Sequence, residues 1–419
     1  MNNENSWIGI DAIAFHGPEC YVDMAELAKA RGIDPAKYQK GLGQLKMAVA
    51  TPCEDTVTMA AQAGRKALDK FDVDASEIGM LIIGTETGID HSKPAAVYVH
   101  ELLGLPQNCR TFETKHACYG ATAGMTSAID WIAAGRARGK KALVIASDIA
   151  RYGIGTPGEP TQGAGAVAMV ISDEARLVAI NSEAMGDYTR QVMDFWRPLY
   201  SKYAFTDGHY SIECYLDALS GAWEAARENA ADKTRFALES IDACFYHVPF
   251  TAMARKAHFR HWEIDQDVVK TNKDVSDEYA QQIMLSYQKR VSPWLSINAE
   301  VGNIYTGSLF LALMDYLRQN ENSSEANISL FSYGSGCGAS YCLASVHPDA
   351  AQFARLCDPS EELNNRRKLS VTEYETVIKD TENTDLHENE NLDPTQWNLS
   401  DNLRYLGTRN HQRVYVNSG

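Results

Sequence analysis

The sequence of 419 residues lacks the features that mark several broad classes of protein. No apolar run approaches the roughly 18 residues that span a bilayer, and the first residues contain no basic segment followed by an apolar one. Positive charge is scarce, because 39 lysines and arginines face 55 aspartates and glutamates, for a formal net charge of −16. We therefore expect a cytoplasmic protein that binds neither membranes nor nucleic acids, since polyanions repel such a surface.

Closely spaced cysteine pairs are also missing. The nine cysteines are odd in number and scattered, with no C-x-x-C pair that would indicate a zinc site or a redox couple. We interpret them as reduced thiols. With 45% hydrophobic residues, the chain can bury a large core, either as two domains or as one two-lobed body.

Strand and helix patterns alternate along the chain, which predicts an α/β fold of stacked layers. Buried strands are expected near residues 80–85, 111–114, 142–147 and 165–171, and again near 177–180, 243–248, 328–333 and 339–346. Glycine-rich corners at 161–166 and 333–338 precede the last strand of each set.

This repetition suggests that one fold unit is duplicated, with halves at residues 1–172 and 173–419. An undivided α/β domain with chance similarity is the alternative. The stretch from residue 379 to 402 is acidic, rich in asparagine and poor in aliphatic residues. We expect it to be a mobile surface segment.

Cys118 lies where a short strand gives way to a helix rich in small residues. The N–H groups and the positive dipole end of that helix would favour the thiolate, lowering the thiol pKa from about 8.5 toward neutrality. Gly120 and Gly124 would leave room for an acyl group or a closely packed backbone. Cys118 is thus a candidate nucleophile, and the alternative is a small buried cysteine that fills a crowded helix start.

Three other segments could supply the groups that a cysteine nucleophile needs. Glu86 follows an apolar strand, where desolvation would raise its pKa toward that of a general base, or else it caps the next helix. His247 ends another strand and is followed by Arg255 and Lys256, although a structural histidine is the ordinary interpretation. Asn303 opens a helix, where it either orients a carbonyl oxygen or caps.

Motifs follow one another along almost the whole chain. They are Thr85-Glu-Thr-Gly-Ile-Asp, Phe112-Glu-Thr-Lys-His-Ala-Cys-Tyr, Asp148-Ile-Ala-Arg-Tyr-Gly, Gly158-Glu-Pro-Thr-Gln-Gly-Ala-Gly-Ala, Asp194-Phe-Trp-Arg-Pro, His247-Val-Pro-Phe-Thr, Val301-Gly-Asn-Ile-Tyr-Thr-Gly-Ser and Phe331-Ser-Tyr-Gly-Ser-Gly. Together they resemble the bacterial type of hydroxymethylglutaryl-CoA synthase, in the thiolase superfamily. Thiolases and ketoacyl synthases instead pair the cysteine with two histidines or with histidine and asparagine.

The resemblance implies a five-layer αβαβα fold, a homodimer, and no metal or redox cofactor. It also implies condensation of acetyl-CoA with acetoacetyl-CoA in the mevalonate pathway. Cys118 would carry the acetyl group, Glu86 would remove a methyl proton, and His247 with Asn303 would hold the acetoacetyl oxygens. The backbone N–H groups of Cys118 and Ser335 would form an oxyanion hole.

Further substrate contacts are expected from the same motifs and from nearby bases. Residues in the motifs are Tyr152, Gly153 and Thr161, and the bases proposed for the CoA tail are Arg197, Lys202, Arg255 and Lys256. Each base could equally be a solvated surface residue. Two positions depart from the family pattern: Ala252 stands where close relatives commonly have lysine, and His116 replaces a more usual Glu, Gln or Asn.

Two other functions remain open at this point. A polyketide β-branching synthase would take its acetyl group from an acyl-carrier protein, and the segment Tyr405-Leu-Gly-Thr-Arg-Asn resembles that form. We favour free CoA substrates because the motifs around Trp196 and Glu159 look like the mevalonate form. A non-catalytic scaffold that binds acyl-CoA is disfavoured because Cys118, Glu86 and His247 occur together.

Overall fold

The computed structural model describes residues 7–266, 277–320, 324–384, 387–397, 399–400 and 403–416. Its main sheet is built from β1 (Gly9–His16), β4 (Ile78–Gly84), β5 (Arg110–Thr114), β6 (Lys141–Ala150), β7 (Gly163–Ser172), β8 (Val178–Thr189), β11 (Ala243–Tyr246), β12 (Ala326–Gly334) and β13 (Gly338–Val346). These nine strands lie in the order β11-β12-β13-β8-β1-β7-β6-β4-β5. The eight strands expected from the sequence are all present, and the α/β fold class is confirmed.

The central strand β1 was not expected from the sequence. Asp11 and His16 interrupt its apolar pattern, yet both are buried. The carboxylate of Asp11 lies 2.6 Å from Nε of Arg176, and Nδ1 of His16 lies 2.6 Å from Oε1 of Glu362. Polar residues are tolerated in this buried strand because distant partners pair with them, which no local pattern reveals.

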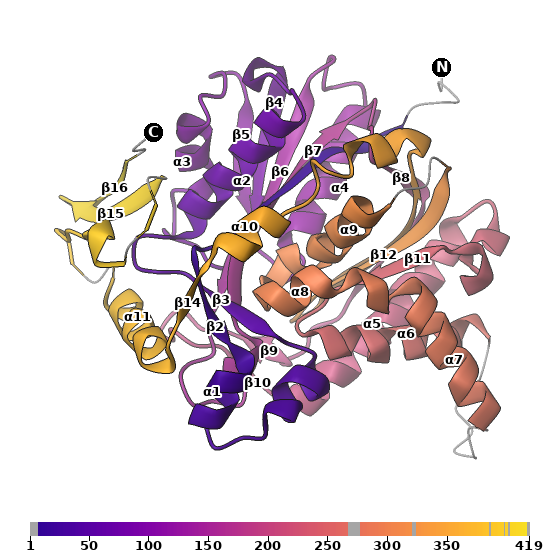
Figure 1. Cartoon of the computed structure of the whole chain (residues 1–419). Helices are drawn as coiled ribbons and strands as arrows, with labels where there is room; N and C mark the ends of the chain where they lie inside the picture. Colours follow the sequence, from indigo (N-terminus) through magenta and orange to yellow (C-terminus); the bar gives the residue numbers. More distant parts are fainter. Residues whose placement is uncertain are drawn as a thin grey trace.

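Two helices lie between the two ends of the sheet. Helix α4 (Gly120–Ala133) packs on β4, β6 and β7, and helix α9 (Ser308–Gln319) packs on β11 and β12. The hydroxyl of Thr122 on α4 lies 2.8 Å from that of Ser332 on β12, and the N–H of Ala121 donates to Oγ1 of Thr306, just before α9. On the outer faces, α2 (Thr56–Lys70) packs on β1, β6 and β7, while α5 (Gly208–Asn229) packs on β8 and β13 (Figure 1). This gives the helix-sheet-helix-sheet-helix order that the family resemblance implies.

The remaining helices surround these layers. They are α1 (Met24–Ala30), α3 (Ala95–Leu102), α6 (Thr251–Asp265), α7 (Asp277–Arg290), α8 (Ser296–Val301), α10 (Ser360–Asn365) and α11 (Val371–Asn383). Short strands form small sheets: β2 (Cys20–Asp23) with β3 (Lys46–Val49) and β14 (Arg367–Leu369), β9 (Phe195–Trp196) with β10 (Phe205–Thr206), and β15 (Arg404–Arg409) with β16 (Gln412–Val416).

A second, smaller core lies under α11, where Tyr374 and Val377 pack with apolar residues of β2 and α1. The last residues of α11, from 379 to 383, belong to the segment that we expected to be mobile. They form regular helix instead. Residues 385, 386, 398, 401 and 402 of that segment lie outside the described residues.

Candidate active site

Cys118 stands on a tight turn between β5 and α4. Ala117 has a φ of +37°, and the N–H of Tyr119 donates to the carbonyl of His116 at 2.8 Å. A left-handed backbone at a residue other than glycine is uncommon and is often found at functional sites. The small residues of α4 serve close packing on β4, because a Cβ on Gly84 would lie 2.3 Å from the nitrogen of Ala121.

Three aromatic rings surround the Cys118 thiol: Tyr152, Phe195 and Tyr305. Their ring centroids lie 6.1 to 6.3 Å apart, and each pair meets at a steep angle. The cysteine is only 9 % exposed. This aromatic cage leaves little of the cysteine accessible to solvent.

The pKa of Cys118 contradicts the expectation from its position at a helix start. Burial raises the pKa of this thiol well above its usual value, and the charges of Glu86, Asp148 and Asp194 raise it further. The expected thiolate is therefore wrong for the resting protein. Desolvation and three carboxylates outweigh the helix dipole, whose effect is small by comparison.

Glu86 lies in the turn after β4, with one carboxylate oxygen, Oε1, buried and without a hydrogen-bond partner among the described residues. Burial and the charge of Asp148 raise the pKa of Glu86 to about 8, while Arg197 lowers it. The capping interpretation is wrong, because α3 begins at Ala95, whose N–H donates to Glu113 at 2.8 Å. The raised pKa agrees with the expectation for a general base.

Asp148, at the end of β6, holds the Glu86 turn. Its Oδ1 accepts hydrogen bonds from the hydroxyls of Thr85 and Thr87 and from the N–H groups of Glu86 and Thr87. The guanidinium of Arg197 also contacts this turn and donates to the carbonyl of Glu86. Arg197, which we expected at the CoA tail, thus contacts the candidate base.

His247 follows β11 directly and is buried. The backbone N–H of His247 donates to the carbonyl of Phe331 at 2.8 Å, and its backbone carbonyl accepts from the hydroxyl of Tyr215 at 2.9 Å. Burial lowers the pKa of the ring to about 3, so the imidazole is neutral. Its Nδ1 is buried without a partner among the described residues, which leaves a polar atom available to a ligand.

Asn303 lies in the turn between α8 and α9, and its side chain meets the aromatic cage. The amide nitrogen donates to the hydroxyl of Tyr152 at 3.2 Å, while Oδ1 accepts from the N–H of Tyr305 at 2.9 Å and from Ser308 at 3.2 Å. Gly163 allows this approach, because a Cβ there would lie 2.7 Å from the carbonyl oxygen of Asn303. Asn303 therefore holds the turn before α9 and faces the site, but it does not cap α9, whose N-terminus has no side-chain cap.

Ser335 lies on the corner between β12 and β13, and hydrogen bonds to Asp194 hold this corner in place. The buried carboxylate of Asp194 accepts from the N–H of Gly336 at 2.8 Å and from the hydroxyl of Tyr333 at 2.6 Å. A Cβ on Gly334 would lie 2.7 Å from the carbonyl oxygen of His116. The two segments that carry the expected oxyanion donors are thus held in backbone contact.

One cavity of about 650 Å³ brings six of the predicted residues together: Cys118, Tyr152, Thr161, His247, Asn303 and Ser335. Glu86 and Gly153 do not line it. Glu86 is close enough to Cys118 and Tyr152 to shift the pKa of both groups, and the N–H of Gly153 donates to Gln162 at 3.1 Å.

A second cavity of about 340 Å³ lies across the segments 40–43 and 250–255, which also border the first. Lys40 and Arg255 line it, together with Ala252. Lys256 is exposed and lines neither cavity. The ammonium of Lys202 donates to the carbonyl of Glu382 instead of facing a cavity.

Two residues that these contacts single out had no role in the sequence-based hypothesis: Asp148 and Lys40. Asp148 could have been found, because it follows a buried strand next to that of Glu86, and neighbouring strand ends meet at one edge of a sheet. Lys40 carries no local signal, since its position beside α6 depends on packing between distant segments.

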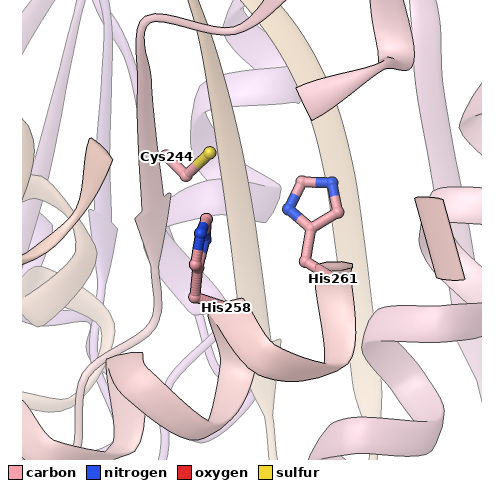
Figure 2. A group of neighbouring side chains, drawn as sticks. All are labelled: Cys244, His258 and His261. Atoms are coloured by element: carbon pink, nitrogen blue, oxygen red, sulfur yellow. The ribbon is translucent and has the colours of Figure 1, made fainter. Parts of the chain in front are cut away.

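A separate cluster is formed by Cys244 on β11 and by His258 and His261 on α6 (Figure 2). Their possible ligand atoms are within 4.8 Å of one another, as a metal site would require. The hydroxyl of Tyr246, however, lies between the two rings, 3.0 Å from Nδ1 of His258 and 2.8 Å from Nδ1 of His261.

The other ring nitrogens of this cluster also meet hydroxyls. Nε2 of His258 lies 2.9 Å from Ser286 and Nε2 of His261 lies 3.3 Å from Tyr341. Burial, and secondarily the charge of Arg290, lower the pKa of His258 to about 3. We interpret the cluster as a neutral hydrogen-bonded network, because the ring nitrogens are satisfied and a neighbouring guanidinium disfavours a cation.

None of the helices among the described residues is long and apolar enough to cross a membrane.

Comparison with known proteins places these observations in a family. The family model for the N-terminal part of hydroxymethylglutaryl-coenzyme A synthase matches residues 5–176, and that for the C-terminal part matches 178–279 and 258–417. A curated relative from Enterococcus faecalis, named hydroxymethylglutaryl-CoA synthase, is 38% identical over 399 residues, which cover 95% of this chain and 96% of the relative.

Solved structures match over nearly the full length. MvaS in complex with 3-hydroxy-3-methylglutaryl coenzyme A is 41% identical with a TM-score of 0.89, covering 99% of this chain and 100% of that one. The curacin pathway HMG synthase in complex with holo donor-ACP is 32% identical with a TM-score of 0.89, covering 98% of this chain and 99% of that one. These matches confirm the thiolase-like fold.

Proposed function

The chain belongs to the hydroxymethylglutaryl-CoA synthase family, and from this premise we propose that it is an acyltransferase that joins acetyl-CoA, acetoacetyl-CoA and water into 3-hydroxy-3-methylglutaryl-CoA and free CoA. The observation that carries this proposal is the enclosure of Cys118, His247 and Asn303 in one cavity, with the carboxylate of Glu86 beside the thiol.

The first step is transfer of the acetyl group to Cys118. The sulfur attacks the thioester carbon, the bond to the CoA sulfur breaks, and an acetyl-thioester forms on the enzyme. Because the thiol is neutral at rest, its proton must leave during the attack and finally reach the departing CoA sulfur. The neutral imidazole of His247, whose pKa of about 3 is too low to hold that proton, keeps its unpartnered Nδ1 for a substrate oxygen.

The second step forms the carbon–carbon bond. Ionised Glu86 removes a proton from the acetyl methyl group, and the resulting enolate attacks the ketone carbon of acetoacetyl-CoA. Donors at Cys118 and Ser335 stabilise the enolate oxygen, each worth about 3 kcal/mol. The proton on Glu86 then passes to the new alkoxide, and water cleaves the thioester to release product and the Cys118 thiol.

The second cavity is a suitable place for the phosphates of the CoA tail. Lys40 and Arg255 supply positive charge there, beside the segment that continues from His247 into α6. Ala252 lines the same cavity, so the charge that a lysine would add at this position is absent. We assign no phosphate contact to Arg197, since it donates to the Glu86 carbonyl.

The pathway and assembly are proposed on the same basis. We propose a cytoplasmic homodimer that serves isoprenoid synthesis, uses no metal or redox cofactor, and is built from repeated halves at 1–172 and 173–419. A carrier protein as acetyl donor is the second candidate, since the curacin relative was solved with a donor-ACP.

Mass spectrometry of the intact chain tests the function. Acetyl-CoA should add one acetyl group to Cys118, Cys118→Ser should add none, and Glu86→Gln should acetylate but condense more than about 100-fold slower. A chain that never gains an acetyl group from any donor is not a synthase. Labelling from acetyl-carrier protein alone would replace free CoA as the donor.

A further inference from the structure

Two side chains hold the loop from Tyr152 to Gln162, which lines the cavity. The carboxamide oxygen of Gln162 accepts from the N–H groups of Tyr152 at 2.7 Å and Gly153 at 3.1 Å. The buried carboxylate of Glu159 accepts from the N–H of Gly155 at 2.9 Å. The positions of the Gln162 and Glu159 side chains therefore fix the backbone of this loop.

Both of these side chains are anchored by the C-terminal helix α11. The fully buried hydroxyl of Tyr374 accepts from the amide nitrogen of Gln162 at 3.0 Å and donates to Glu159 at 3.2 Å. Arg31 adds a second connection, with two bonds of 2.7 and 2.8 Å to Glu159 and one of 2.7 Å to Glu375 on α11. A buried network of this kind rigidifies the elements it joins.

The other end of α11 holds a second loop beside the cavity. The hydroxyl of Tyr203 donates to the Glu382 carboxylate, and Lys202 donates to the Glu382 carbonyl. The next three residues, 204–206, line the cavity. The two loops also touch, since a Cβ on Gly153 would lie 3.4 Å from the ring of Tyr203.

We propose that α11 sets the geometry of the active site by holding both cavity loops, with Tyr374 and Glu382 as positioning residues. Neither side chain lines the cavity. Tyr374 acts through Gln162 on Tyr152, whose ring belongs to the cage around Cys118. This inference rests on the proposed function, because the geometry matters only if Cys118 is acylated.

Tyr374→Phe removes the hydroxyl and keeps the ring in its small core. The rate of Cys118 acetylation at saturating acetyl-CoA should fall about three- to tenfold, as the loss of one or two buried hydrogen bonds implies. Tyr415→Phe is the matched control, because it removes a phenol bond of 2.8 Å from another C-terminal element to Asp55. It should lose comparable thermal stability and acetylate at the unmodified rate.

Glu382 gives an independent test if Tyr374→Phe does not fold. Glu382→Ala should slow acetylation, while Glu382→Gln retains an acceptor for Tyr203 and should restore most of the rate. Unmodified rates in both Tyr374→Phe and Glu382→Ala would overturn the proposal, as would an equal loss in Tyr415→Phe.

Hydrogen exchange separates failure of this proposal from failure of the proposed function. The amides of Tyr152 and Gly153 should exchange faster in Tyr374→Phe than in Tyr415→Phe, whether or not the chain is acetylated. If the unmodified chain takes no acetyl group, the proposed function fails while exchange still reports on the loop. Unchanged exchange at these two amides would show that α11 does not hold the loop.

Discussion

Oδ1 of Asp148 lies 2.9 Å from the backbone nitrogen of Glu86 and accepts its hydrogen bond. The same carboxylate is the charge that, after burial, most raises the pKa of Glu86. Asp148 thus both positions the proposed base and adds to the rise in its pKa that burial causes.

Asp148→Asn should shift the pH dependence of condensation to lower pH. Glu86 acts as a base only when ionised, so kcat/KM in the unmodified enzyme should rise with pH through the Glu86 pKa of about 8. Removing the Asp148 charge while keeping its shape should lower that midpoint. A pH–rate profile measures it, and an equal or higher midpoint would contradict the assigned cause.

Arg197→Gln should move the same midpoint in the opposite direction. The guanidinium lowers the pKa of Glu86, so its removal should raise the pKa and reduce activity most strongly near neutral pH. Activity should recover as the pH increases. If Arg197 instead binds the CoA tail, the KM for acetyl-CoA would rise at every pH and the midpoint would not move.

The Cys118 thiol should react slowly with iodoacetamide at neutral pH. Burial and three carboxylates raise its pKa, so the thiolate fraction at pH 7 should be far below that of an ordinary cysteine. The alkylation rate should still be rising above pH 9, where an ordinary thiol of pKa about 8.5 levels off. Peptide mapping measures the labelling of Cys118, with Cys118→Ala as the control. Fast labelling at pH 7 would contradict the raised pKa.

The histidine network should make the fold sensitive to acid. His258 has a native pKa of about 3, so the unfolded chain takes up a proton below about pH 6.5 that the folded chain refuses. Stability from this group is therefore present above pH 6.5 and is lost as the pH falls toward 3. His258→Gln should be less stable at pH 7, with the deficit shrinking by about 1.4 kcal/mol per pH unit between 6 and 4. Urea unfolding measures how the free energy of unfolding depends on pH in the unmodified chain and in His258→Gln. The same pH dependence in both proteins would contradict the role assigned to His258.

Gly84→Ala should destabilise the protein and disturb the site. A Cβ there would lie 2.3 Å from the Ala121 nitrogen, so α4 would have to move away from β4 at a cost of about 1–3 kcal/mol. Gly208→Ala is the control, because no atom lies within 4 Å of its added Cβ. That change should stabilise the first turn of α5 by up to about 1 kcal/mol. Thermal unfolding of both variants compares them directly.

The sequence by itself determined eight of the nine strands of the main sheet and the candidates Cys118, Glu86 and His247. Strand periodicity is local, and each candidate follows directly from the end of a strand or the start of a helix, so a linear pattern suffices. The expectation that the Glu86 pKa is raised also agreed with the structure, because an acidic residue next to an apolar strand is desolvated wherever that strand packs.

Only the tertiary structure decided how these groups are tuned. The pKa of Cys118 depends on burial by residues that come together only in the fold and on carboxylates from three separate segments, so the local helix dipole predicted the wrong direction. The contact of Arg197 with Glu86 and the strand β1, which pairs its polar residues with distant partners, are equally invisible to a linear pattern. Desolvation and charge act through space, and the distances that govern them are fixed only when the chain is folded.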